Sequence, residues 1–136
     1  DDKTGWLDGP QIDINPPGPW RTGMVWDETR GNGRWLYPDV PKGQWVDPPM
    51  APPEMVFYYS DEEPGWNELE IKAVGTRITA HLNGVKVTAY DGSGVLDDDV
   101  HKARNVGLSG HIALQIHTGD LLKIRYKDIY MKDLSN

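Results

Sequence analysis

Three consecutive stretches of alternating apolar and polar residues constrain the fold of this chain more than any other feature. They span residues 68–74, 77–82 and 85–90, and turns of two residues separate them, the second of which is Asn83-Gly84. A period of two is typical of strands with one buried face, and Asn-Gly is a strong hairpin signal because both residues tolerate positive φ. The pattern therefore predicts an antiparallel meander of three strands. Its buried residues are expected to be Leu69, Ile71, Ile78, Leu82, Val85 and Val87.

The composition favours a single all-β domain. The chain of 136 residues contains 15 glycines and 11 prolines, and it shows no long helical periodicity. This combination is typical of an antiparallel β-sandwich. The length is sufficient for one hydrophobic core but not for two.

Charge and cysteine content exclude several classes of function. The formal net charge of −7 argues against binding to nucleic acids or anionic membranes, because contacts to phosphates require a basic surface. The chain has no cysteine, so disulfides and thiolate catalysis are excluded, and His, Asp and Glu are the only strong metal ligands. No apolar run approaches the roughly 20 residues of a membrane-spanning helix.

Residues 110–118 are predicted to form a strand whose two faces differ in chemistry. The face expected in the core consists of Ile112, Leu114 and Ile116. The other face consists of His111, Ala113, Gln115 and His117. Two imidazoles and an amide are more typical of a binding site than of a solvated strand. Residues 121–134 are predicted to form a further strand, with an ordinary basic face.

The N-terminal part offers two further short strands. Residues 11–15 alternate, and prolines follow them, which remove ladder donors. The polar face of this strand consists of Gln11, Asp13 and Asn15. Residues 22–29 form the next predicted strand, in which Asp27 and Glu28 point to opposite faces, so at most one of them is expected to share a site with Asp13.

Two longer connections interrupt the strands. Residues 35–59 are rich in proline and aromatic residues, and they fit either an Ω-like cover of one end of the sandwich or a loop that contacts a substrate. Residues 91–105 contain three consecutive aspartates at 97–99. Because their spacing lacks the ligands of an EF-hand, a short helix capped by Asp, or a solvated turn, is favoured over a calcium loop.

The stretches WNELEIKAVGTRITAHLNGVKVTAYDG and VGLSGHIALQIHTGDLLKIRYKDIYMKDL, together with PQIDIN and TGMVWDETRG upstream, carry a resemblance to a known family. In this order and spacing they resemble the 3-keto-disaccharide hydrolase family over nearly the whole chain. The resemblance implies a concanavalin A-like jelly roll and a periplasmic or secreted location. Members of the family begin further upstream, which implies that residues 1–136 are the C-terminal part of a single domain. We therefore expect the chain to pack with a further polypeptide segment or chain that supplies the missing strands.

The family resemblance also implies a reaction. A ketone at C3 of a sugar acidifies the proton on C2, so a base can remove it, and the glycosidic bond at C1 then breaks by elimination; water can add to the product. Such a site needs a base, an acid for the leaving oxygen and an electrophile at the enolate oxygen, and a divalent metal could be that electrophile. The alternatives are a non-catalytic carbohydrate-binding module and a structural domain, because a fold alone does not fix a function.

The candidate site residues follow from these requirements. His117 is the first candidate for the base or a metal ligand, Asp13 for binding a sugar hydroxyl or a metal, and Glu28 is the third catalytic candidate. The substrate-binding candidates are Gln115, His111, Asp27, Arg21, Arg30, Trp26 and Tyr37.

Each candidate also has a structural alternative. His117 can be satisfied by nearby backbone groups, the arginines can pair with carboxylates, and the aromatic residues can belong to the core. We expect His117, Gln115 and Asp13 to converge with Asp27 or Glu28 and one arginine in a concave pocket. His81 and His101 are expected outside it.

Overall fold

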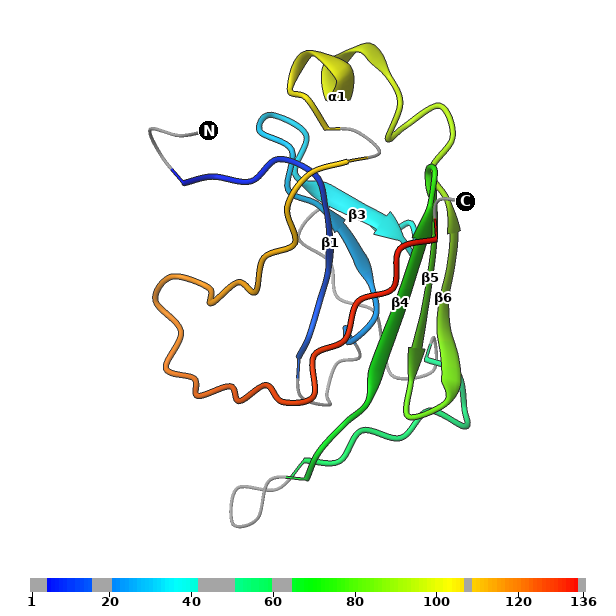
Figure 1. The fold of residues 1–136 in the computed structure, drawn as a ribbon, viewed down its shortest axis with the longest axis vertical. Coiled ribbons are helices and arrows are strands. Elements are labelled where there is room, and N and C mark those ends of the chain that lie inside the picture. Colours follow the sequence, from blue (N-terminus) through cyan, green and yellow to red (C-terminus); the bar gives the residue numbers. More distant parts are fainter. Residues whose placement is uncertain (1–4, 16–20, 42–50, 60–64, 107–108, 135–136) are drawn as a thin grey trace.

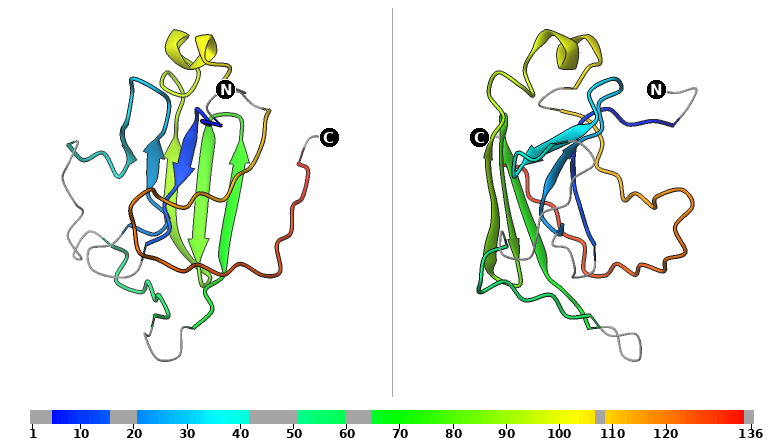
Figure 2. Two further views of the ribbon diagram at one scale, coloured as in Figure 1. Left: turned by 90° about the vertical axis from the view of Figure 1, so that its left-hand side faces the viewer. Right: turned by 180° about the vertical axis from the view of Figure 1, so that it is seen from behind.

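The chain folds into two antiparallel sheets of three strands each, with one short helix (Figure 1). The computed structural model describes residues 5–15, 21–41, 51–59, 65–106 and 109–134. The first sheet has the order β1 (Pro10–Ile12), β2 (Val25–Asp27) and β3 (Arg34–Tyr37). The second has the order β4 (Leu69–Val74), β5 (Arg77–Leu82) and β6 (Val85–Asp91), and helix α1 (Asp99–Ala103) follows it. The two sheets lie one against the other (Figure 2), so the predicted all-β sandwich is confirmed.

The second sheet is the meander that the alternation predicts. Leu69 lies opposite Leu82, and Leu82 lies opposite Val85, so the three strands pair in sequence order. Asn83 and Gly84 form the tight turn with φ values of 50° and 81°. The Asn83 side chain accepts the Glu68 backbone N–H at 2.9 Å, which ties the turn to the start of β4. Local sequence is sufficient to specify this sheet.

The core lies between the sheets and takes residues from both. One cluster contains Met24, Trp35, Ala80, Leu82 and Val87, and the other contains Val25, Leu36, Ile78 and Leu96. Ile78, Leu82 and Val87 are thus buried as predicted, whereas Leu69 and Val85 are half-buried. The prediction was wrong for Ile71, which is 48% exposed.

Gly23, which lies just before β2, is in close contact with β6 of the second sheet. The Thr88 hydroxyl donates a hydrogen bond to the Gly23 carbonyl across the sandwich. A Cβ on Gly23 would lie 2.3 Å from Cγ2 of Val87, and the residue has a φ of +90°. Only glycine fits this contact without displacing β6.

The C-terminal segment differs from the prediction. Apart from a turn at residues 118–119, residues 109–134 contain no regular secondary structure, and no backbone hydrogen bond joins them to the rest of the described chain. Ile112, Leu114 and Ile116 are 80%, 55% and 68% exposed, so their expected place in the core was wrong. A strand forms only beside a hydrogen-bonding neighbour, and alternation alone does not provide one.

The two long connections, residues 91–105 and 35–59, contain a capped helix and residues that pack on the core. Asp98 caps α1 by accepting the His101 backbone N–H at 2.9 Å, so the acidic run is a capped short helix as favoured. In the long connection, Met55 and Phe57 pack against the first core cluster, as expected for a cover. Residues 42–50 of that connection lie outside the described residues. No helix among the described residues is both long and apolar enough to cross a membrane.

Candidate functional site

A polar cluster follows β1 at the point where the chain turns toward β2. The Asp13 backbone pairs with Met24 and Gly23, which continues the β1–β2 ladder past the end of β1. Gln11 donates its side-chain amide to Oδ1 of Asp13 at 3.3 Å, as expected for neighbours on one strand face. Nε of Arg21 lies 3.6 Å from Oδ2 of Asp13. The cluster therefore combines a carboxyl group, an amide and a guanidinium group.

Asn15 completes this cluster and holds Arg21 in place with a hydrogen bond. Its side-chain oxygen accepts a hydrogen bond from Nη2 of Arg21 at 2.8 Å. The predicted polar face of Gln11, Asp13 and Asn15 is thus linked through side-chain contacts, and Arg21 is the arginine that joins it.

Burial raises the pKa of Asp13 above its ordinary value, and the charge of Arg21 and the hydrogen bond from Gln11 oppose this effect. The Asp13 side chain is only 17% exposed. Its Oδ2 atom is buried and has no hydrogen-bond partner among the described residues. Burial thus favours the protonated form of this carboxyl group more than solvent would, which is the direction that a proton donor needs.

His117 lies on the exposed C-terminal segment, with His111 and Gln115. Its side chain is 72% exposed, and Nδ1 is 3.3 Å from Oδ2 of Asp120. The charge of His117 also lowers the pKa of Asp13, although less than Arg21 does. The two candidates are thus electrostatically coupled, but the described residues show no direct contact between them.

A second polar cluster lies at the other end of the β1–β2 ladder, and two of its side chains are fully buried. Oδ1 of Asp27 accepts the Thr29 backbone N–H at 3.0 Å, and Oδ2 lies 3.1 Å from Nε2 of His101. Nδ1 of His101 lies 2.7 Å from Oδ1 of Asp98. Asp27 and His101 are both 0% exposed. The imidazole therefore ties α1 to β2, and Asp27 does not face solvent.

Sequence reasoning missed His101 because it was placed in a loop. The available signal was its position three residues after Asp98, a possible helix cap. At that spacing a side chain can return to the cap residue. Its second partner, Asp27, is 74 residues away in the chain, and no local pattern could have revealed it.

Arg30 forms an ion pair with Asp8, a residue that the sequence analysis did not select. Nη2 of Arg30 lies 2.6 Å from Oδ2 of Asp8, and its Nε also contacts both carboxylate oxygens. The side-chain hydrogen bond from Arg30 lowers the pKa of Asp8 to about 2. Of the two interpretations of Arg30, pairing with a carboxylate is the one observed.

The ladder register separates the two polar clusters. Pro10 lies opposite Asp27 and Ile12 opposite Val25, and Glu28 donates its backbone N–H to Gly9. Glu28 is therefore about four residues of strand, roughly 13 Å, from the level of Asp13. The structure brings Arg21 to Asp13 but brings neither Glu28 nor Asp27 there.

The aromatic candidates contribute to packing. Trp26 packs edge-on against Trp35 with ring centroids 4.9 Å apart, at the border of the first core cluster. Tyr37 is half-buried beside the second cluster. It also lines a shallow hollow with Pro38, Lys86 and other residues, none of which is a predicted site residue.

The described residues do not gather a metal-binding set. No three of their His, Asp and Glu side chains lie close enough together to hold an ion. Asp13 has an arginine beside it, and His117 has one carboxylate partner. A divalent metal does not fit these side chains, so no reaction step is assigned to one.

Comparison with known proteins adds the family. No curated protein and no solved structure matches the chain. A family model described as the 3-keto-alpha-glucoside-1,2-lyase-like domain matches residues 1–132. This is the family that the strand sequences resemble, and the match covers nearly the whole chain. The chain therefore belongs to the 3-keto-α-glucoside-1,2-lyase-like domain family.

Proposed function

We propose that this domain cleaves the glycosidic bond of 3-keto-glycosides, including 3-keto-disaccharides, by removing the C2 proton. The observation that carries the proposal is the environment of Asp13. Its carboxyl group is mostly buried, its pKa is raised by that burial, and Arg21 lies 3.6 Å away. A proton donor beside a fixed positive charge meets two of the three requirements of the elimination. Family membership supports the choice of a 3-keto sugar as the substrate class.

In the proposed reaction His117 is the base. It removes the C2 proton that the C3 ketone makes acidic, and the charge of Arg21 stabilises the enolate oxygen at C3. The electron pair then forms the C1–C2 double bond while the bond from C1 to the glycosidic oxygen breaks. Asp13 gives its proton to that oxygen. The products are the released alcohol or sugar and an unsaturated 3-keto sugar, to which water can add to give net hydrolysis.

This arrangement differs from that of an ordinary glycosidase. Those enzymes use two carboxyl groups that flank the scissile bond and an oxocarbenium-like transition state. The partner of Asp13 is a guanidinium group, and the ladder register holds Asp27 and Glu28 away from it. An enolate needs such a positive charge beside it, whereas an oxocarbenium ion would be destabilised.

Release of free sugar from a 3-keto-disaccharide tests the proposal. The chain should release it, and His117→Ala and Asp13→Asn should each lower turnover by about 10²-fold, as expected for loss of an acid–base group. His81→Ala is the matched control, because His81 lies on β5 outside the cluster. A parallel incubation with a chelator measures whether a metal takes part.

The Asp13→Asn protein should remain folded. A raised pKa means that the folded protein disfavours the charged carboxylate, so the stability that Asp13 contributes decreases as the pH rises through that pKa. Replacing it by a neutral amide should leave the unfolding free energy at pH 7 unchanged or higher. Saturable binding of the sugar without release would instead favour the alternative, a carbohydrate-binding module.

A further inference from the structure

Two pairs of an aspartate and an arginine lie at the two ends of β1, and their geometry differs. Before β1, Nη2 of Arg30 lies 2.6 Å from Oδ2 of Asp8, and Nε of Arg30 donates to both carboxylate oxygens at 3.1 and 3.2 Å. After β1, Nε of Arg21 lies 3.6 Å from Oδ2 of Asp13, which is beyond the range of an N–H···O hydrogen bond. The first pair is therefore closed, with hydrogen bonds between its charged groups, whereas the second is open.

The pKa values of the two aspartates are shifted in opposite directions. The side chains of Asp8 and Asp13 are only 6% and 17% exposed. The side-chain hydrogen bond from Arg30 is the largest influence on Asp8 and lowers its pKa to about 2. Burial is the largest influence on Asp13 and raises its pKa, and the charged groups that oppose this effect are Arg21 and, more weakly, His117. The open pair thus leaves burial as the dominant effect on the carboxyl group, which the closed pair does not.

Asn15 provides the contact that holds the second pair open. Its side-chain oxygen accepts a hydrogen bond from Nη2 of Arg21 at 2.8 Å. Asn15 is itself fixed by the buried Thr22, whose hydroxyl accepts the Asn15 backbone N–H at 2.9 Å and donates to the Asn15 carbonyl at 2.5 Å. A turn closed by the hydrogen bond from the Met24 backbone N–H to the Arg21 carbonyl fixes the start of the arginine side chain. The guanidinium group is therefore held at both ends of its side chain.

We propose that Asn15 is a positioning residue that keeps Arg21 from closing onto Asp13 in a hydrogen-bonded ion pair. The amide of Asn15 is neutral, so it holds the guanidinium group without neutralising it. The inference rests on the proposed function, in which the carboxyl group donates a proton and the guanidinium group stabilises an enolate. A closed pair would favour the ionised carboxylate and would direct the positive charge at that carboxylate instead of at the substrate.

Loss of the Asn15 side chain should allow the pair to close. Oδ2 of Asp13 is buried and has no hydrogen-bond partner among the described residues. A hydrogen bond between charged groups is about twice as strong as one between neutral groups, so an arginine released from the amide should turn toward this oxygen. The contacts between Thr22 and residue 15 use only backbone atoms of residue 15. Asn15→Ala should therefore leave the path of the chain unchanged.

Titration of the Asp13 carboxyl carbon by NMR tests the inference without any substrate. In Asn15→Ala the pKa of Asp13 should fall below its wild-type value, because Arg21 then donates to the carboxylate. In Arg21→Ala the pKa should instead rise, because the opposing charge is lost. With Arg21 already replaced, Asn15→Ala should have no further effect. The opposite directions of the two single variants distinguish a residue that holds the arginine back from one that merely supports the loop.

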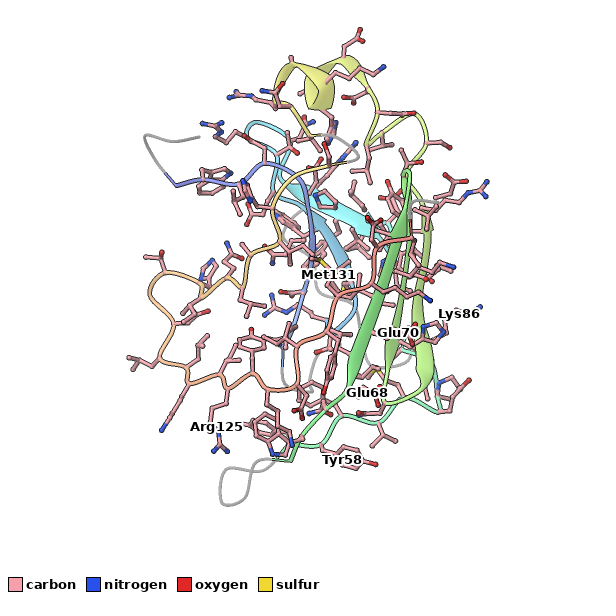
Figure 3. The ribbon with its side chains drawn as sticks, viewed as in Figure 1. Tyr58, Glu68, Glu70, Lys86, Arg125 and Met131 are labelled. Atoms are coloured by element: carbon pink, nitrogen blue, oxygen red, sulfur yellow. The ribbon has the colours of Figure 1, made fainter. Side chains whose placement is uncertain are left out.

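Lys86→Ala is the control for loss of a positive charge elsewhere. Lys86 lies on β6, on the outer face of the second sheet (Figure 3), and its replacement should leave the titration of Asp13 unchanged. The inference is overturned if Asn15→Ala leaves the pKa of Asp13 unchanged or raises it, since the arginine would then not have closed onto the carboxylate. It is also overturned if the effect of Asn15→Ala persists in the Arg21→Ala protein.

Turnover of a 3-keto-disaccharide separates this inference from the proposed function. Asn15→Ala should lower kcat about tenfold or more with little change in KM, as expected when reacting groups lose their geometry. The ratio of variant to wild-type turnover should rise as the pH falls, because protonation of Asp13 opens the closed pair again. Equal turnover of both proteins would overturn the positioning role. The expected titration in a wild-type chain that releases no sugar would support the hold of Asn15 on Arg21 and contradict the proposed function.

Discussion

His101 links parts of this molecule that are far apart in the sequence. Its ring nitrogens face Asp98 at 2.7 Å and Asp27 at 3.1 Å, and the side chain has no exposed surface. Both ring nitrogens thus lie within hydrogen-bond distance of a carboxylate oxygen. The residue therefore acts as a buried bridge between the start of α1 and the end of β2.

Removal of the His101 side chain should lower the free energy of unfolding. We predict that His101→Ala lowers the unfolding free energy by about 3 kcal/mol, because it leaves Oδ2 of the buried Asp27 without its hydrogen-bond partner. Urea unfolding at pH 7 measures this. His81→Ala, on the charged outer face of β5, should change stability by less than about 0.5 kcal/mol. Equal effects of the two substitutions would contradict the bridge.

The Asp8–Arg30 pair predicts a defined pH dependence. Because Arg30 lowers the pKa of Asp8 to about 2, the pair stabilises the fold fully above the ordinary aspartate pKa of about 3.9. This contribution should disappear as the pH falls from about 4 to about 2. Asp8→Asn should therefore destabilise the chain at pH 6, and the difference from the wild type should disappear near pH 2.

Thermal unfolding of both proteins across this pH range is the measurement. Asp39→Asn is a control, since Asp39 is exposed and outside this ion pair. A difference between wild type and Asp8→Asn that stays constant down to pH 2 would show that the ion pair is not its cause.

At the scale of the elements, local partners decide what the sequence can predict. The β4–β5–β6 meander could be predicted because each strand has its neighbour only two residues away, across turns such as Asn83-Gly84. Residues 110–118 alternate just as regularly, but the described chain contains no strand that pairs with them. Alternation gives the face that a residue would occupy, and not whether a partner exists.

The same distinction applies to the candidate site. Gln11, Asp13 and Asn15 were found because their shared face follows from a period of two, and Arg21 is six residues from Asn15 along the chain. The separation of Glu28 from Asp13 follows from the register of β1 against β2. That register depends on the packing of both sheets, which no local pattern reports.

The contact between Gly23 and Val87 of β6 can be tested by substitution. We predict that Gly23→Ala lowers the unfolding free energy by about 3 kcal/mol, because the new Cβ collides with Val87 and the backbone has positive φ. Gly31→Ala, with a φ of +91° and open space around it, should cost only about 1 kcal/mol. Chemical denaturation of both variants measures the difference.

The double variant Gly23→Ala/Val87→Ala provides a check on the cause. In a protein that already carries Gly23→Ala, Val87→Ala removes the methyl group that the new Cβ meets. Val87→Ala should therefore lower the unfolding free energy less in that protein than it does in the wild type. Additive effects would mean that the two sheets do not meet at Gly23 as described.

At the scale of the whole molecule, the candidate site takes residues from two segments that are far apart in the sequence. Asp13 follows β1, the edge strand of the first sheet, and the C-terminal segment with His117 lies on the same side of the molecule (Figure 1). The two acid–base candidates thus come from opposite parts of the chain.

The fate of the hydrogen on C2 tests the central proposal most directly. A 3-keto-disaccharide with deuterium at C2 of its 3-keto ring is incubated with the chain in ordinary water. The product that contains the 3-keto ring is then analysed by mass spectrometry. The same substrate incubated without the chain must retain its label, and it is the control for spontaneous exchange. Elimination predicts that the product has lost the deuterium, whether or not water adds afterwards. Release of a sugar that still carries deuterium at C2 would mean that the bond breaks without C2 deprotonation, and would contradict the account.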